Sequence, residues 1–321
     1  MSENKSCIAK KTSIGGQALI EGIMMRGPKK SAMAVRTPQR EILLEKWDNE
    51  PANKKPSSFD KFKKLPIIRG VFNFVSSMKM GYSSLMKSAE IAGFEDEGEK
   101  EQSKGLMAVI GVIAAVLGVV LSVALFIYLP SALYDLIAWP LPMLKESKFL
   151  FLRSLFEGIL KVVILVTYMA VVSRMKDIKR TFQYHGAEHK TIFCYEAGLE
   201  LTVENVKKQG RFHPRCGTSF LIVMVIVGVL IGMLIPTHIG NFEIHSLVRS
   251  LIKIALLPLT MGLGYEFIKL AGKTDNAFTR ILSAPGLWMQ RITVLEPTDD
   301  MIECAIAAVN EVIPEDGSDL M

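Results

Sequence analysis

The chain has 321 residues, half of them apolar and 22% charged, with a formal net charge of +6. This composition is too hydrophobic for a disordered tail and too charged for a chain that lies in a membrane throughout. The apolar residues instead form near-continuous blocks that approach the roughly 20 residues needed to cross a bilayer, which excludes a purely soluble protein. The four cysteines lie far apart without a Cys-x-x-Cys pair, which excludes a disulfide-rich secreted domain and a zinc ribbon.

The first segment, residues 1–65, is predicted to be rich in β-structure and cytoplasmic. Short apolar or mixed runs at 17–25, 31–37 and 41–47 are separated by Gly27-Pro28 and Pro38-Gln39. Turn-forming residues between short apolar runs predict a small β-meander. Three separate charges in or beside otherwise apolar runs stand out, namely Glu21, Arg26 and Arg36. They could bind an anionic group of a substrate, because Arg offers a bidentate fork, or they could be solvated strand edges.

The next segment, residues 66–104, is predicted to be an amphipathic helix followed by a charged linker. Apolar residues recur every three or four positions after Pro66, at Ile67, Val71, Phe74, Met78, Tyr82, Leu85 and Ala89. This spacing predicts a helix with one apolar face. The helix is expected either to lie on the inner leaflet or to pack against the membrane spans.

Four apolar blocks are predicted to be transmembrane helices, two in segment 105–173 and two in segment 218–271. They cover residues 106–129, 149–172, 218–236 and 251–271, and the first is expected to stop at Pro130. The second block carries Arg153, Glu157 and Lys161 on one helical face, where they can pair in sequence. Gly228 and Gly232 in the third block are spaced for close contact with another helix, which leaves a homo-oligomer possible.

The distribution of Lys and Arg predicts the orientation of the chain. These residues are concentrated in 1–104 and 174–217 and are sparse in 130–148 and 237–250. Because positive segments stay inside, both termini and the loop 174–217 are expected in the cytoplasm, beside an anionic inner leaflet. We therefore expect a mainly α multi-pass protein of the cell membrane. The net charge requires no nucleic-acid partner, and no nucleic-acid motif is present.

The last segment, residues 272–321, is predicted to be a cytoplasmic tail with one amphipathic helix. Thr298 followed by Asp299 and Asp300 is typical of a helix start. Apolar residues then recur on one face, so this helix is expected to dock on another part of the chain.

The motif His-x-x-Glu-His at 185–189, in the loop 174–217, points to a metal site. On a helix, His185 and His189 project from one face at the spacing that holds one metal ion. Glu188 stands next to them as a proton-transfer group. The alternative is a pair of surface histidines on a basic loop.

A metal site needs at least a third ligand, and the candidates are His213, Cys216 and Glu266. His213 and Cys216 lie at the end of the same loop, and imidazole with thiolate suits Zn²⁺. Glu266 stands 77 residues after His189, a separation close to that of the distal glutamate in inverted His-x-x-Glu-His metallopeptidases. A salt bridge to Lys269 or Arg174 is the alternative role for Glu266.

Several of these motifs together resemble the YqhQ-like family of bacterial membrane proteins. The matching runs are GGQA at 15–18, EGIMMRGP at 21–28, YHGAEHK at 184–190, HPRCGTSF at 213–220, YE at 265–266 and PGLW at 285–288. Members are commonly labelled predicted metal-dependent enzymes. The resemblance therefore implies a multi-span membrane protein and a metal-dependent activity.

The leading hypothesis is a zinc-dependent hydrolase at the cytoplasmic membrane face, with Glu188 as general base and a peptide or a lipid-linked group as substrate. A membrane scaffold or regulator with a structural metal site is the alternative, since four closed ligands make a structural site and three make a catalytic one. A transporter is a third hypothesis, motivated by Glu157 and Lys161 inside the second span.

Overall fold

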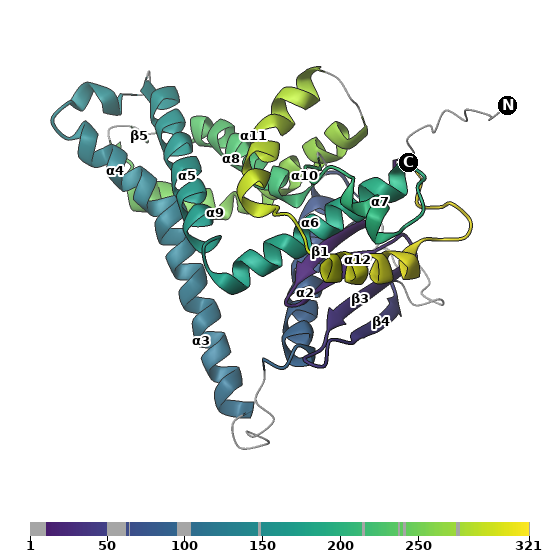
Figure 1. Ribbon diagram of the computed structural model, residues 1–321. Coiled ribbons are helices and arrows are strands. Elements are labelled where there is room, and N and C mark those ends of the chain that lie inside the picture. Colours follow the sequence, from purple (N-terminus) through teal and green to yellow (C-terminus); the bar gives the residue numbers. More distant parts are fainter. Residues whose placement is uncertain are drawn as a thin grey trace.

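A four-stranded antiparallel sheet in the order β1-β2-β3-β4 lies at the centre of one half of the molecule (Figure 1). This computed structural model describes residues 11–49, 62–63, 65–94, 104–146, 149–213, 216–236, 238–239, 242–273 and 277–320. The strands are β1 (Gly15–Leu19), β2 (Gly22–Arg26), β3 (Lys30–Arg36) and β4 (Ile42–Asp48). The predicted meander is confirmed, but the run 17–25 forms two strands. A tight turn at Ile20 and Glu21 divides it, and Glu21 has a φ of 51°.

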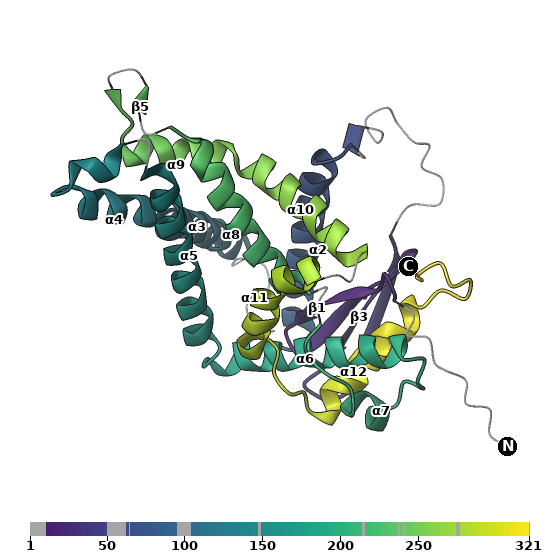
Figure 2. The same cartoon turned by 90° about the horizontal axis from the view of Figure 1, so that it is seen from above.

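The two faces of the sheet are covered by different helices, as the view from above shows (Figure 2). Ile23 and Met25 on β2 point to one face, where α6 (Lys176–Glu196) and α12 (Asp299–Val312) cover them. Met24 points to the other face, where α2 (Ile68–Ile91) lies. Alternation along each strand produces these two cores, because successive side chains point to opposite sides.

The helix α2 is confirmed, and Leu85 of the predicted apolar face packs against the sheet, but the most deeply buried residues of α2 lie beside that face. Gly70, Gly81 and Ser84 are buried, whereas Met78 and Tyr82 are 58% and 65% exposed. Small residues let the sheet and the helix α10 (Leu257–Lys273) approach the α2 backbone closely. A side chain added at Gly81 would collide with Gln17 on β1.

The other half of the molecule consists of long apolar helices (Figure 1). The first is continuous from α3 (Lys104–Val123) through a π-helical turn, η1 (Ala124–Tyr128), into α4 (Leu129–Ala138). The prediction that it stops at Pro130 is wrong. Proline lacks an N–H and crowds the preceding turn, and the wider π turn just before it accommodates the ring. A short 3₁₀ turn, η2 (Pro142–Lys145), then leads to α5 (Leu150–Val172).

The third predicted block is α8 (Gly217–Leu234), and the fourth is a broken helix. After the short strands β5 (His238–Ile239) and β6 (Phe242–Glu243), the chain forms α9 (Ser246–Ala255) and then α10. The pair is bent by 52° between them. Pro258 lies at the start of α10, where its missing N–H is tolerated. The predicted block 251–271 therefore falls on two helices that meet at a bend just before Pro258.

Two helices are long and apolar enough to cross a membrane, Val109–Ala138 and Leu150–Val172, and the bent pair would be a third if it forms one span. In the described part of the chain, the apolar segment Leu221–Leu234 of α8 is shorter. Membrane association is thus compatible with the fold, while the four-span topology stays a prediction.

The remaining helices connect the two halves. α6 follows α5 directly, and α7 (Val203–Lys207) lies beside α6 and α12. The predicted tail contains one further helix, α11 (Ala277–Thr293), which packs against α8 and α5. The helix predicted after Thr298 is confirmed as α12, and it docks on β2, β3 and α6.

Candidate metal centre

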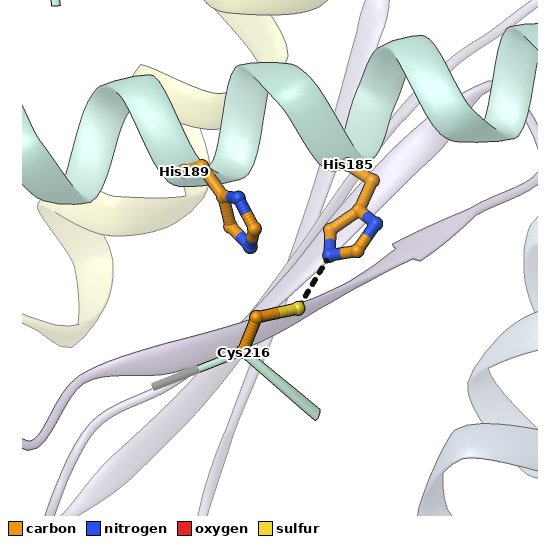
Figure 3. Close-up of side chains that lie close together, drawn as sticks. All are labelled: His185, His189 and Cys216. Carbon is orange, nitrogen blue, oxygen red and sulfur yellow. Dashed lines mark hydrogen bonds between the residues drawn. The ribbon is translucent and has the colours of Figure 1, made fainter. Parts of the chain in front are cut away.

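His185 and His189 lie one turn apart on α6, on the side that faces the start of α8 (Figure 3). The predicted helix thus carries the motif, and the two imidazole rings are 4.4 Å apart between centroids. His189 is buried and His185 is partly buried. The pair is therefore part of the packed interior, and the alternative of two surface histidines on a basic loop is not what the structure describes.

Cys216, the residue before α8, brings a thiol to the two histidines. Its sulfur lies 3.2 Å from His185 Nε2. One donor atom from each of His185, His189 and Cys216 lies within 4.8 Å of the others (Figure 3). Tetrahedral zinc with bonds of about 2.0–2.3 Å places its donors roughly 3.5 Å apart. The three side chains therefore fit a zinc ion after small side-chain rotations.

Both imidazoles are oriented by main-chain carbonyl groups. His185 Nδ1 lies 2.9 Å from the oxygen of Thr293, and His189 Nδ1 lies 2.6 Å from the oxygen of Arg211. A carbonyl can only accept, so each Nδ1 must carry the proton and each Nε2 keeps its lone pair. Burial lowers the pKa of His189, which favours the neutral ring that binds metals. Metal-binding histidines are commonly oriented in this way, by a hydrogen bond from the ring nitrogen that does not bind the metal.

Glu188 lies beside the three donors without being one of them. Its Oε1 accepts a hydrogen bond of 3.0 Å from the N–H of Gly16 on β1. The side chain is buried, and this burial raises its pKa, against the opposing effects of His185 and the Gly16 N–H. A Cβ on Gly16 would collide with the sulfur of Met25 and the main-chain oxygen of Met24 and would lie only 3.0 Å from the Glu188 carboxyl carbon, so glycine at this position allows the close packing.

A cavity of about 500 Å³ joins these groups. It is lined by β1, by one face of α6 and by the first residues of α8. Glu188, both histidines and Cys216 are in its wall. The volume is within the range of ordinary ligand sites, so a small molecule or a short peptide segment has room beside the donors.

His213 lines the same cavity but lies outside the group of three donors. Its ring centroid is 5.6 Å from that of His189, and its Nε2 is 3.7 Å from a carboxylate oxygen of Glu196. Gln290 on α11 holds the His213 main chain through two hydrogen bonds of 2.8 Å. The structure thus places the predicted ligand His213 next to the site, with the carboxylate of Glu196 close to its ring.

Glu266 is not among the three grouped donors and pairs with other residues, which corrects its prediction as a metal ligand. Its carboxylate accepts hydrogen bonds from Arg69 on α2 and, at 3.2 Å, from the N–H of Ile67. The bonds join α10 to the start of α2. Glu266 does form a salt bridge, but with Arg69 instead of Lys269 or Arg174.

Two of the three charged residues predicted to bind substrate connect elements of the fold. Glu21 accepts two hydrogen bonds from Arg180 on α6. Arg36 donates to the main-chain oxygen of Asp300 at 2.7 Å and to Glu303 at 2.9 Å, both on α12. The third residue, Arg26, is exposed and lines a neighbouring cavity with Gly15–Gln17. None of the three lines the cavity at the histidines.

A second cluster of charges lies between α4, α5 and α9. Arg153 bonds Asp135 at 2.9 Å and Glu157 at 3.2 Å, as the four-residue spacing on α5 predicts for the second contact. Lys253 and Ser131 also bond Glu157, the latter at 2.8 Å. Arg153 and Glu157 are each at most 3% exposed. This cluster lies at the far end of α8 from Cys216, so it is separate from the histidines.

Sequence reasoning missed the groups that support the histidines. The carbonyls of Thr293 and Arg211 and the N–H of Gly16 belong to the main chain, and main-chain groups have no sequence signal of their own. One indirect signal exists in Gly186, between His185 and Glu188, because a side chain there would lie 1.9 Å from the Leu295 oxygen.

Comparison with known proteins shows which family contains this chain. Residues 65–315 match a family described as "Protein of unknown function (DUF1385)". The chain is also 34% identical over 311 residues to "Uncharacterized protein YqhQ" of Bacillus subtilis (strain 168), covering 93% of this chain and 92% of that protein. No solved structure matches. The chain therefore belongs to the DUF1385 family, which includes YqhQ-like proteins.

Proposed function

We propose that this member of the DUF1385 family is a zinc-dependent hydrolase of the cell membrane, with His185, His189 and Cys216 as metal ligands. The observation that carries the proposal is the pair of hydrogen bonds from Nδ1 to main-chain carbonyls. These bonds fix both rings in the tautomer that leaves Nε2 free for a metal. A zinc ion bound there would lower the pKa of a water molecule and polarise a carbonyl group.

Glu188 is the proposed general base. It shares the cavity with the three donors, and burial raises its pKa, which makes its carboxylate a stronger proton acceptor than an exposed glutamate. The Gly16 N–H holds one carboxylate oxygen and leaves the other for the water. Glu188 would take a proton from the attacking water and deliver it to the leaving group.

The number of donors favours a catalytic site over a structural one. Catalytic zinc sites commonly have three protein ligands, whereas structural sites have four. The described residues form one group of three donors beside an open cavity. The alternative function, a scaffold or regulator with a structural site, requires His213 to turn from Glu196 to the metal and close the fourth position.

We further propose that the apolar helices place this site at the cytoplasmic face of the cell membrane. Large apolar side chains of α3 are exposed, with Val119 at 63% and Leu121 at 66%. Lipid is the environment that such a surface requires. A cysteine at Leu141 should react with a membrane-impermeant maleimide on intact cells, and one at Lys208 should react only after permeabilisation. Reaction of both on intact cells would contradict this orientation.

Zinc analysis of the purified protein tests the metal site directly. The wild type is expected to hold about one zinc ion per chain, in keeping with a single three-ligand site. The double substitution His185→Ala and His189→Ala should abolish binding. His245→Ala is the matched control, because His245 caps α9 far from the site, and it should keep the zinc. Zinc-free wild type, or a double variant with full zinc content, would overturn the proposal.

Ligand geometry separates the enzyme from the scaffold. X-ray absorption of the zinc protein should show one sulfur neighbour and the outer-atom scattering of two imidazole rings for the hydrolase. A third imidazole ring, lost in His213→Ala, would favour the scaffold. Glu188→Gln should keep the zinc in both cases and should abolish hydrolysis if the site is catalytic.

A further inference from the structure

The strand β1 is an edge of the sheet and also one wall of the cavity. In the described residues it pairs with β2 alone, and Gly15, Gly16, Gln17 and Ala18 line the cavity with the three donors and Glu188. Gly15 and Gly16 are exposed. An edge strand beside a reactive group is a surface on which another extended chain can pair.

The pairing register shows which main-chain groups of β1 face away from the sheet. In an antiparallel pair, every second residue directs its N–H and C=O away from its partner. The Gly16 N–H bonds Glu188 and the Ile20 N–H bonds Ser88, so the outward residues are the even-numbered ones. Ala18 stands between them. Its N–H and C=O, together with the Gly16 C=O, are therefore directed to the open side of β1.

The hydrogen bond between Gly16 and Glu188 interrupts the free edge of β1 at one position. Glu188 occupies the Gly16 N–H, so an added strand would pair with the Gly16 C=O and with both groups of Ala18. The added strand would then pass Glu188 where pairing with β1 is interrupted. Antiparallel strands lie about 4.8 Å apart, which puts its main chain inside the cavity, beside the donors.

We propose that the substrate is an extended peptide segment that adds to the sheet as a strand next to β1, an inference that rests on the proposed hydrolase function. Pairing would hold the main chain of the segment and would present one of its peptide bonds to Glu188. Hydrolysis then adds the oxygen of water to the carbonyl carbon and breaks the C–N bond. One proton of the water passes through Glu188 to the leaving nitrogen.

The absence of side chains at Gly15 and Gly16 suits this use. A side chain added at Gly15 would meet no atom within 4 Å, so the space beside it is open. Recognition through the main chain makes the peptide backbone the recognised group, whereas side-chain preference would come from the cavity walls. The class of substrate is therefore a locally unfolded or extended segment, in preference to a folded surface or an isolated lipid headgroup.

The test uses the full-length protein in nanodiscs, loaded with zinc and carrying Glu188→Gln so that bound peptides are not consumed. The probe is a pool of fluorescein-labelled randomised octapeptides, and the peptides retained are identified and measured by fluorescence anisotropy. Ala18→Pro removes the outward N–H and should weaken their binding at least tenfold. Ala18→Val keeps the N–H and should weaken binding clearly less than Ala18→Pro does. Proline is tolerated on an edge strand where its N–H is not needed by the sheet.

Modified peptides provide a second measurement that does not depend on folding of the variant. Two versions of a retained octapeptide would be compared, one N-methylated at its odd-numbered residues and one at its even-numbered residues. One version should bind at least tenfold more weakly, and the other should bind nearly as well as the unmodified peptide. Equal binding by Ala18→Pro and Ala18→Val, together with no register effect, would overturn strand addition. Failure of the whole pool to bind would also overturn it. Zinc content, measured on the same samples, shows separately whether the metal site itself exists.

Discussion

The substitution Gly186→Ala tests whether main-chain packing around α6 holds the histidines. Gly186 faces the segment between α11 and α12, and an added Cβ would lie 1.9 Å from the oxygen of Leu295. The Leu295 N–H bonds the oxygen of Phe182 at 2.9 Å, so this segment is tied to α6. Thr293, whose carbonyl orients His185, is two residues earlier.

The magnitude follows from two opposing effects. Alanine stabilises a helix interior over glycine by about 1 kcal/mol. Real Cβ contacts stay beyond 3.0 Å, so Leu295 must move by at least 1.1 Å, and its atom is main chain without rotatable freedom. Overpacking of this kind costs typically 1–3 kcal/mol. We expect a net loss of up to about 2 kcal/mol in the free energy of unfolding, because the steric cost opposes and at its upper end exceeds the gain in helix propensity.

The same displacement would disturb the nearby Thr293 carbonyl, which is the partner of His185 Nδ1. Loss of such a support typically weakens metal binding by about 10–100-fold. Zinc affinity would be measured by competition with a chelator, and stability by urea unfolding in detergent. Gly118→Ala on α3 is the matched control, because its Cβ would meet no atom within 4 Å, and it should leave zinc affinity unchanged. A Gly186→Ala protein with wild-type stability and zinc affinity would refute the reasoning.

Three further predictions concern groups at other places in the fold. Glu157→Gln leaves Arg153 and Lys253 buried without their shared carboxylate and should cost about 3–5 kcal/mol in urea unfolding, against little change for the exposed Glu90→Gln. Burial raises the pKa of Cys304 to about 11 from 9.0, so the folded state keeps a proton that the unfolded chain loses. Stability should therefore be complete below pH 9 and fall between pH 9 and 11 by about 2–3 kcal/mol, a loss absent in Cys304→Ala. At pH 8 iodoacetamide should label the partly exposed Cys216 and should not label the buried Cys194 and Cys304. Added zinc should protect Cys216 from the reagent. If Cys216 is labelled equally fast with and without zinc, it is not a metal ligand.

The helical part of the site could be predicted from the sequence because its signal is local. A spacing of four places His185 and His189 on one face of any helix, and Arg153 and Glu157 follow the same rule on α5. Cys216 was one of three candidates for the third ligand. The structure places it beside the histidines because the first residue of α8 lies next to α6. Glu266 shows the limit of this method, because its partner Arg69 is 197 positions away and no linear spacing indicates it.

The amphipathic pattern of α2 predicted the buried face only in part, for a related reason. Periodicity identifies a face with large apolar residues, but burial depends on how closely the neighbouring main chain approaches. Gly70 and Gly81 permit that approach, and the large residues at Met78 and Tyr82 remain outside. A pattern of small residues on one face and large apolar residues on another is then ambiguous, because either face can be the one that packs closely against a neighbouring element.

The position of Cys216 connects the two halves of the molecule. The histidines belong to a helix that packs on the sheet, and the thiol belongs to the first residues before an apolar helix. A metal bound by all three would therefore fix the start of α8 against α6, and both elements form walls of the cavity beside β1. Because the same ion would supply the chemistry and set the width of this cavity, metal loading and peptide binding should rise together in a titration with zinc. Peptide binding that is complete without zinc would mean that β1 alone forms the recognition surface.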